Sequence, residues 1–316
     1  MALRETIVEV AKDVARRAVR VPTVQHLIER AESLANEERN RMGPAEPVAP
    51  PSPPPPAVEP LTAPLGQHGK QERYGEYWDF YVDREFPELV QRDASGNTVF
   101  TWPGDEWGDE QYWRQSFDKM FKQHVPPEST RFAEIGPGSG KYSLMVLEAW
   151  KNATVAAFDV SRSYLKVLEK RCAPLVADGR LRPFVIEDRP DIIDRTAEQL
   201  GWAGELDCLY SMDAMVHVDL QYLVAYWLSA ARTLRIGGKL IMSVADATSD
   251  GGFNKLVGDV PVCFPLQGKM CPKFEWLSPQ LVEQVLGRLG FVIEATYNFN
   301  HRDFFFVARL ERRPTP

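Results

Sequence analysis

The chain has little cysteine, no long apolar run and no excess of positive charge. Its four cysteines form no C-x-x-C pair and have no histidine partners at zinc spacing, so we expect free thiols. No stretch reaches the roughly 18 apolar residues of a membrane-spanning helix or resembles a signal peptide, so we expect a cytoplasmic protein. The net charge of −7 disfavours general nucleic-acid binding, which requires a basic surface.

The apolar content is nevertheless high enough for one large core. Of the 316 residues, 44% are hydrophobic and 11% aromatic, so the chain can bury one main domain with smaller appendages. Shifts in composition divide it into four parts. They are a helical appendage over 1–42, a proline-rich linker over 43–70, aromatic and acidic lid helices over 71–128, and the main domain over 129–316.

The N-terminal segment has the pattern of an amphipathic helix. Leu3, Ile7, Val10 and Val14 recur at helical spacing beside a group of basic residues. The proline-rich residues that follow cannot build a core and are typical of a semi-rigid spacer. Three roles stay open for residues 1–41: a poorly ordered or self-associating appendage, a docking helix for a partner protein, or a helix on an anionic membrane surface.

The glycine-rich segment FAEIGPGSGKYS, at 132–143, carries the strongest functional signal. Glycines tolerate left-handed backbone and let N–H groups approach a ligand closely. A phosphate-binding P-loop is disfavoured, because it requires a glycine where Ile135 stands and a serine or threonine where Tyr142 stands. A dinucleotide fingerprint that begins at Gly136 is weakened, because it requires a glycine where Lys141 stands.

The remaining pattern is acidic-x-G-x-G-x-G, formed by Glu134, Gly136, Gly138 and Gly140. Its carboxylate can accept from an ammonium group while the turn passes beneath a ribose, which suits S-adenosylmethionine better than a phosphate. A second acid, Asp159, ends the predicted strand 154–158, about 20 residues after the turn, where it can hold ribose hydroxyls.

Three further strands are predicted at 182–187, 206–211 and 237–246, and they alternate with helices. Asp188 follows the first of these strands and could reach an adenine amino group. Together with the strand that precedes the glycine turn and the strand at 154–158, these make five strands, and their alternation with helices indicates an α/β fold.

With these motifs the chain resembles the class I S-adenosylmethionine-dependent methyltransferase family, in its small-molecule branch. The resemblance rests on FAEIGPGSG, AAFDVS, FVIEDR, YSMDAMVHV and LRIGGKLIMSVAD, and it extends through WLSPQLVEQVLGRLGFVIE and DFFFVARL to cover roughly residues 130–310. It implies a Rossmann-like seven-stranded sheet with an antiparallel last strand. It also implies S-adenosyl-L-methionine as the cofactor, with Met212 added to the cofactor-binding residues.

Aromatic residues before the first strand are candidates for the acceptor side. Tyr74 and Trp78 recur at helical spacing, and family members commonly place such helices over the cofactor as a lid. Trp102 and Trp107 flank a turn with two acids, which is typical of a sugar- or cation-binding loop. His301 lies just before the final strand and could reach the pocket. Core packing is the competing interpretation for the helical aromatics.

His217 is the best-placed base if the acceptor is a hydroxyl, because segments after strand four line the methyl-transfer site in this fold. A structural role for this histidine is the alternative. Metal-dependent relatives bind magnesium through acids comparable to Asp213 and Asp246, but Ala247 replaces an expected asparagine, so we expect no metal. The residues 248–273 predict a long irregular connection with an apolar wall.

We therefore predict an S-adenosylmethionine-dependent methyltransferase that acts on a small molecule, saccharide or lipid-linked glycan, with O-methylation favoured. The first alternative is a tethered nucleoside-binding scaffold without turnover, because fold does not fix function. The second is methyl transfer to a protein. Nucleic-acid amino groups are disfavoured as acceptors, because SMDA stands where Asn-Pro-Pro-aromatic would be required.

Overall fold

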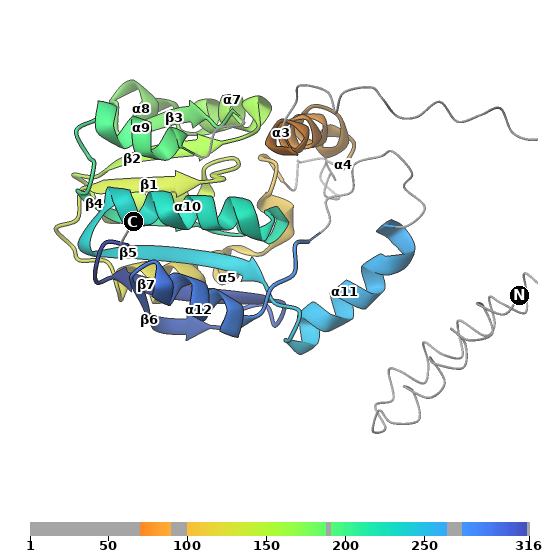
Figure 1. Cartoon of the computed structure of the whole chain (residues 1–316). Helices are drawn as coiled ribbons and strands as arrows, with labels where there is room; N and C mark the ends of the chain where they lie inside the picture. Colours follow the sequence, from red (N-terminus) through yellow and green to blue (C-terminus); the bar gives the residue numbers. More distant parts are fainter. Residues whose placement is uncertain (1–69, 90–99, 188–190, 264–273, 315–316) are drawn as a thin grey trace, which may run out of the picture. The chain divides into compact units, whose positions relative to one another are not determined.

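The computed structural model describes residues 70–89, 100–187, 191–263 and 274–314. Within these ranges lies a seven-stranded sheet in the order β3-β2-β1-β4-β5-β7-β6 (Figure 1). Strands β1 to β5 pair in parallel, whereas β7 runs antiparallel to both of its neighbours. The predicted Rossmann-like sheet with an antiparallel last strand is confirmed.

The strand order reverses between the neighbouring strands β1 and β4. From β1 the chain continues outward to β2 on one side, and from β4 it continues outward to β5 on the other. The strands are β1 Arg131–Ile135, β2 Thr154–Asp159, β3 Leu181–Val185, β4 Leu206–Ser211, β5 Leu234–Ala245, β6 Phe291–Tyr297 and β7 Asp303–Leu310. In open α/β sheets a crevice forms at the carboxyl ends of the strands where the order reverses. The functional site is therefore expected beyond the ends of β1 and β4.

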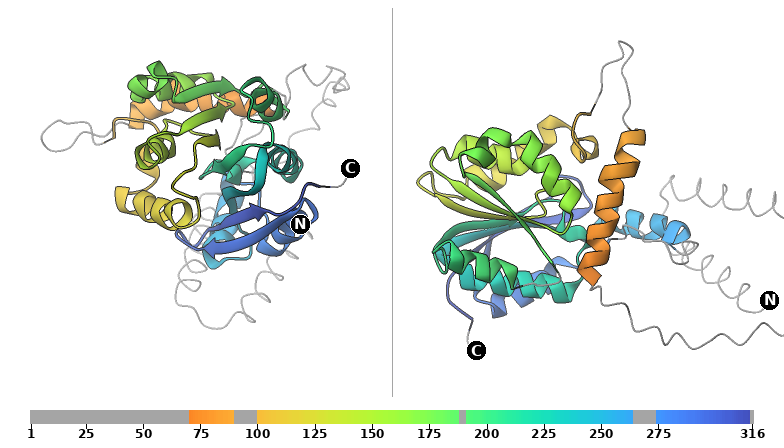
Figure 2. Two further views of the ribbon diagram at one scale, coloured as in Figure 1. Left: turned by 90° about the vertical axis from the view of Figure 1, so that its left-hand side faces the viewer. Right: turned by 90° about the horizontal axis from the view of Figure 1, so that it is seen from above.

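Helices cover both faces of the sheet (Figure 2). Apolar residues of α5, α6, α7 and α8 pack on one face, and those of α9, α10 and α12 pack on the other. The helices are α3 Lys70–Phe80, α4 Phe86–Leu89, α5 Glu110–Phe117, α6 Lys141–Ala149, α7 Arg162–Arg171, α8 Ala173–Ala177, α9 Ile192–Gln199, α10 Leu220–Thr233, α11 Asp250–Cys263 and α12 Pro279–Arg288. Short 3-10 turns lie at Asp105–Trp107 and Met215–His217, and π-helical turns at Tyr81–Glu85 and Asp118–Lys122.

The first strand shows how the sequence assigns residues to the two faces. Side chains alternate along a strand, so every second residue faces the same layer. Phe132 belongs to the core beneath α5 and α6, whereas Ala133 and Ile135 belong to the core beneath α10. Glu134 therefore faces the same layer as Phe132, toward α6.

Helix α3 stands across one end of the sheet (Figure 2) and is fixed to the start of α7. Asp79 Oδ1 accepts a hydrogen bond from Ser161 Oγ at 2.6 Å and from the Ser163 backbone N–H at 2.8 Å. Helix α3 also comes close to the segment before α7, since a Cβ atom on Gly75 would lie 2.6 Å from the Val160 carbonyl oxygen. These contacts hold the aromatic residues of α3 over the carboxyl ends of the strands.

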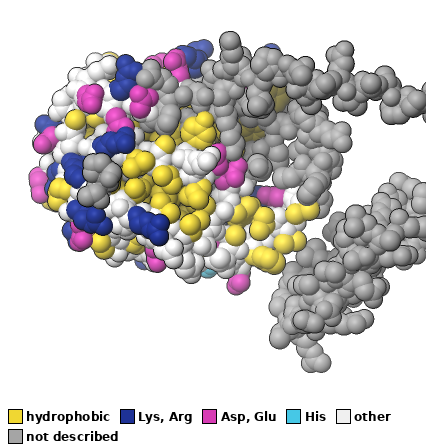
Figure 3. Space-filling model, viewed as in Figure 1, with side chains coloured by type: hydrophobic (Ala, Val, Ile, Leu, Met, Phe, Trp, Pro, Cys, Tyr) yellow, Lys and Arg dark blue, Asp and Glu magenta, His cyan; other side chains and the backbone are white. Residues whose placement is uncertain are grey.

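The prediction of an irregular connection after the fifth strand is wrong for most of its length. Asp250–Cys263 forms the helix α11, and Figure 3 shows hydrophobic side chains gathered over it. Phe253, Val257 and Val260 are exposed there. Gly251 and Gly252 begin the helix because the backbone comes too close for a side chain: a Cβ atom on Gly251 would lie 2.3 Å from the His301 carbonyl oxygen.

Several predictions fall outside the described residues. These are the appendage over 1–42, the linker up to residue 69, and Asp188. Among the described helices, none combines the length and the apolar character that a bilayer-spanning helix needs.

Candidate active site

The glycine turn after β1 has a backbone that requires glycine. Gly136 and Gly138 have φ values of 68° and 53°, in the left-handed region that side chains disfavour. A Cβ atom on Gly136 would lie 2.4 Å from the Cβ of Ala214, so the turn passes directly against the segment after β4. The turn thus forms one wall of a cavity at the ends of β1 and β4, as the strand order predicts.

Asp159, at the end of β2, presents its carboxylate to the same cavity. Its Oδ1 accepts from the Ser161 backbone N–H at 2.8 Å, and its Oδ2 accepts from the Gly138 N–H at 3.3 Å. Burial raises the pKa of Asp159 to about 7. Each oxygen keeps acceptor capacity, so the carboxylate can receive the two hydroxyls of a diol.

Glu134 lies behind the turn and does not line the cavity. Its Oε2 accepts from the Ser143 hydroxyl and, at 3.0 Å, from the Tyr210 hydroxyl. The side chain is 2% exposed, and burial raises its pKa to about 7. These contacts tie β1 to α6 and β4, which is a different position from the ammonium-facing one that the sequence indicates.

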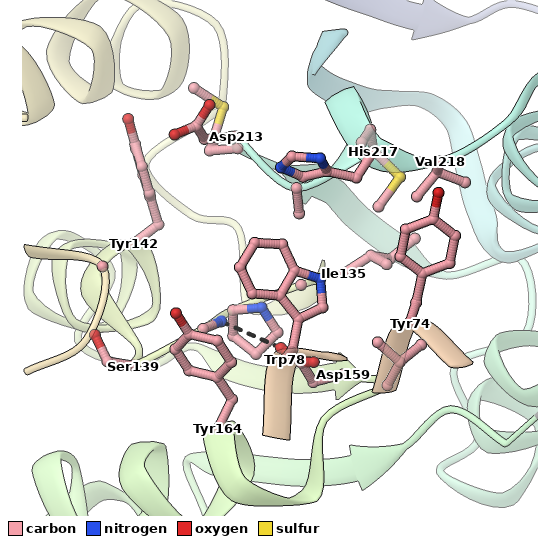
Figure 4. A pocket seen from close by; sticks show the side chains of 18 of the residues that line it. Tyr74, Trp78, Ile135, Ser139, Tyr142, Asp159, Tyr164, Asp213, His217 and Val218 are labelled. Carbon is pink, nitrogen blue, oxygen red and sulfur yellow. Dashed lines mark hydrogen bonds between the residues drawn. The ribbon is translucent and has the colours of Figure 1, made fainter. Parts of the chain in front are cut away.

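Figure 4 shows the cavity from close by, with Asp213 and His217 on the side opposite Asp159 and Tyr164 and with Trp78 between them. The His217 ring contacts Trp78, with centroids 5.3 Å apart, and Phe274, with centroids 4.9 Å apart. His217 is thus held between aromatic rings from α3 and from the segment before α12.

A second cavity adjoins the first and shares part of its wall. The shared residues are Trp78, Trp107, Trp113, Asp213 and His217. The residues that line only the second cavity are mostly aromatic or charged: Tyr77, Tyr81, Glu85, Gly108, Asp109, Tyr112, Lys255, Phe274, Asn300 and Arg302. Two chambers that meet at an aspartate and a histidine can bring two ligands together.

Asp213 is fixed in the shared wall by a backbone conformation and an ion pair. Its φ is 59°, and its backbone N–H donates to Ser243 Oγ at 2.8 Å. Arg302 donates to Asp213 Oδ1 at 2.9 Å and also pairs with Asp303. Burial raises the pKa of Asp213 to about 6, against the opposing effect of Arg302. In the described ranges no three acids, histidines or cysteines are grouped as a metal ion requires.

A cationic pair fastens the Trp-rich turn onto the first cavity. Lys141, the first residue of α6, lies 3.1 Å from the Gly104 carbonyl oxygen and 3.4 Å from Asp105 Oδ1. Arg171 of α7 donates to the same Asp105 oxygen at 3.0 Å. Trp107, in the same turn, contacts Trp78 with ring centroids 5.8 Å apart.

The comparisons with known proteins agree with this geometry. Residues 133–242 match a family model described as a methyltransferase domain. This match includes the glycine turn, Asp159 and the segment after β4, and it agrees with the resemblance to class I S-adenosylmethionine-dependent methyltransferases. No curated protein matches the sequence closely enough to count.

Two solved structures are similar in fold to this chain. One is magnesium protoporphyrin IX methyltransferase (ChlM) from Synechocystis PCC 6803, with 16% identity, a TM-score of 0.51, and coverage of 76% of this chain and 99% of that chain. The other is the cyclase SpnF, with 13% identity, a TM-score of 0.53, and coverage of 79% of this chain and 98% of that chain. At these identities the likeness shows the fold alone.

The structure brings most of the predicted site residues together. Those that line the first cavity are Tyr74, Trp78, Trp107, Gly136, Gly138, Asp159, Met212 and His217. Four predicted residues that the structure describes line neither cavity: Glu134, Gly140, Trp102 and His301. Trp102 lies instead against Arg171, 5.8 Å from its guanidinium carbon, and His301 is exposed.

Sequence reasoning missed other residues of the site. In the motif comparison Lys141 counts only as a mismatch to other motifs, although a lysine directly after a glycine turn is a signal in itself. The sequence suggests Asp213 only as a metal ligand, and no motif points to Arg302. Their roles depend on contacts between segments far apart in the chain, such as Asp213 with Arg302.

Proposed function

We propose that the chain transfers a methyl group from S-adenosylmethionine to a small-molecule acceptor held in the second cavity. The observation that carries the proposal is the shared wall: the cavity beside the glycine turn and the aromatic cavity meet at His217, Asp213 and Trp78. A methyl donor in one chamber and an acceptor in the other would meet there.

The residues of the first cavity fit this cofactor. Asp159 would accept from the ribose hydroxyls, while Gly136 and Gly138 leave room for the nucleoside beneath the turn. Within the described residues, the Tyr164 hydroxyl and the Trp113 indole N–H are buried in this wall without a hydrogen-bond partner. A polar ligand would satisfy both groups, because a buried unpaired polar group is costly.

The chemistry then makes few demands on the protein. When bound, S-adenosylmethionine supplies a methyl group on a sulfonium with a neutral thioether as leaving group. The protein has to align the acceptor with that methyl group and exclude water. Trp78, Trp107 and Trp113 enclose the meeting point with aromatic surface.

For a hydroxyl acceptor, His217 would remove the proton as the methyl group is transferred. A positioned base of this kind contributes about 10² to 10⁴-fold to a rate. His217 faces both chambers, which supports O-methylation over transfer to a nucleophile that needs no base. Asp213 is the second titratable group in the shared wall.

The acceptor side supports a flat or ring-shaped small molecule. Tyr77, Trp78, Tyr81 and Phe274 offer ring faces, while Glu85, Asp109 and Asn300 offer polar groups at the same wall. Aromatic faces with neighbouring carboxylates also suit a saccharide, free or linked to a lipid. Docking of residues 1–41 to a partner protein or a membrane surface, and a cytoplasmic location, stay predictions.

The second candidate function is binding without methyl transfer, by a tethered nucleoside-binding protein. The cyclase SpnF has a similar fold at a TM-score of 0.53, so the fold by itself does not fix the reaction. Turnover separates the two candidates, because cofactor binding fits both.

The experiment is transfer of a radiolabelled methyl group from S-adenosylmethionine into host extract that is fractionated into small molecules, lipids, polysaccharide, nucleic acid and protein. We expect label in the small-molecule, lipid or polysaccharide fraction, and none with Asp159→Ala. Label in the protein fraction alone would move the acceptor to protein. Calorimetric cofactor binding with no label in any fraction would favour the scaffold.

A further inference from the structure

Among the described residues that line the first cavity, Lys141 is the only lysine or arginine. Its side chain is 16% exposed, and its ammonium group lies 4.0 Å from the centre of the Trp113 ring. A buried ammonium group needs partners for its three N–H donors. Among the described residues, Gly104 O and Asp105 Oδ1 account for two of them.

The charges around Lys141 do not balance. Asp105 is shared by the Lys141 ammonium and the Arg171 guanidinium, at 3.4 Å and 3.0 Å from the same oxygen. Glu106 of the same turn also acts on Lys141, but its carboxylate already accepts from the Tyr81 hydroxyl and the Gly104 backbone N–H. Asp105 alone therefore contacts both cations. Asp213 is the next acid that acts on Lys141, and it already pairs with Arg302. Burial lowers the pKa of Lys141, as expected for a cation short of anionic partners.

A second donor lies beside this cation. Trp113 is 6% exposed and lines both cavities, and its Nε1–H has no hydrogen-bond partner in the described part of the chain. The ring whose face meets the Lys141 ammonium thus carries an unsatisfied donor on its edge. A group with one negative charge and two acceptor atoms would satisfy both residues.

We propose that Lys141 and Trp113 form a carboxylate subsite, which binds the α-carboxylate of the cofactor's amino-acid portion. The inference rests on the proposed function, because it takes the ligand of the first cavity to be S-adenosylmethionine. That ligand carries a diol at one end and an α-carboxylate at the other. Asp159 and Lys141 flank the glycine turn from β2 and from α6, so they can bind the two ends.

Arg171 provides a matched control. It shares Asp105 with Lys141, but it does not line the first cavity. It donates instead to Ser139 Oγ at 2.8 Å and lies against Trp102. Arg171→Met therefore breaks one cation contact to Asp105 without removing the cation that faces the ligand.

The test compares two ligands that differ only by the carboxylate. These are S-adenosylhomocysteine and its decarboxylated analogue S-adenosyl-3-thiopropylamine, and their Kd values would be measured by calorimetry. For Lys141→Met we expect a roughly 10- to 100-fold weaker Kd for S-adenosylhomocysteine, the loss of one charge-assisted hydrogen bond. The Kd of the analogue should change by less than about threefold, which also shows that the variant is folded.

The controls sharpen this result. Arg171→Met should change the two Kd values by the same factor, Lys141→Arg should retain the preference for the carboxylate, and Trp113→Phe should lose part of it. Equal weakening of both ligands by Lys141→Met, or no weakening of either, would overturn the subsite while leaving the proposed function intact. A wild-type chain that binds neither ligand would overturn the proposed function and the subsite together.

Discussion

The two buried carboxylates beside the glycine turn should behave alike in folding and differently in ligand binding. Burial raises the pKa of Glu134 from 4.5 to about 7 and that of Asp159 from 3.8 to about 7. Only Asp159 lines the cavity. Glu134→Gln should therefore change the pH dependence of stability and spare cofactor affinity, whereas Asp159→Asn should change both.

The magnitude follows from linkage. Because the folded state holds the Glu134 proton more tightly than the unfolded state, the carboxyl favours folding below pH 4.5, and this advantage is lost as pH rises toward 7. The free energy of unfolding should fall by about 1.4 kcal/mol per pH unit over this window, or roughly 3 kcal/mol in total. The glutamine cannot ionise, so the variant should lack this slope.

The assay is urea unfolding of the wild type and Glu134→Gln at half-unit steps from about pH 5 to pH 8. The difference between the two curves isolates Glu134, because the other groups titrate in both chains. An amide N–H left without an acceptor in that pocket would shift the whole curve of the variant but would not change its slope.

Calorimetry with S-adenosylhomocysteine completes this comparison. We expect less than about a threefold change in Kd for Glu134→Gln, and roughly 10- to 100-fold weakening for Asp159→Asn, which loses a charged acceptor for the hydroxyls. Equal weakening by both variants would refute the reasoning, since it would mean that the Glu134 carboxylate acts on the ligand as the sequence indicates.

Three further predictions concern the same site. Burial raises the pKa of Asp159 to about 7, and its ionised form is the one that accepts from the ribose hydroxyls. Cofactor affinity measured by calorimetry should therefore fall about tenfold per pH unit below pH 7. An affinity that stays constant down to about pH 5.5 would contradict the role of Asp159 in cofactor binding. Gly136→Ala places a methyl group 2.4 Å from the Ala214 Cβ, so urea unfolding should show a loss of about 1 to 3 kcal/mol; unchanged stability would argue against the close approach. His217→Ala should lower kcat at least about 10²-fold with cofactor affinity nearly unchanged, and a variant that turns over at full rate would leave the histidine a structural role.

The sheet and half of the cofactor site could be predicted because their signals are local. The apolar runs that become β1, β2 and β4 are buried between two helical layers, and each ends at a turn or a polar residue. The glycine turn and Asp159 follow the ends of such strands. A short stretch of sequence therefore fixes both their conformation and their place at the edge of the sheet.

Glu134 shows where local reasoning fails. The motif marks it as acidic and adjacent to the ligand, but the alternation of β1 turns its side chain toward α6. There it meets Ser143, nine residues away, and Tyr210 on the neighbouring strand. The sequence does not show that this layer supplies two hydroxyl donors for the carboxylate.

The sequence does not predict helix α11, for a related reason. Glycines lower helix propensity, and the pair Gly251 and Gly252, together with the DVPVCFP and GKMCP elements, predicts an irregular segment. These glycines allow a close tertiary contact, because a Cβ atom on Gly252 would lie 1.7 Å from the Asp246 carbonyl oxygen. Close backbone contact, rather than flexibility, requires glycine at the start of this helix.

The second cavity, in which we propose that the acceptor binds, is lined by segments far apart in the chain, and this has a consequence for specificity. Trp78 and His217 serve both chambers, so changes there should affect cofactor and acceptor together. Tyr77, Lys255 and Phe274 line only the second chamber. Substitutions at these three positions can therefore change acceptor preference without changing the glycine turn or Asp159. For this reason the sequence motifs predict the cofactor but not the acceptor.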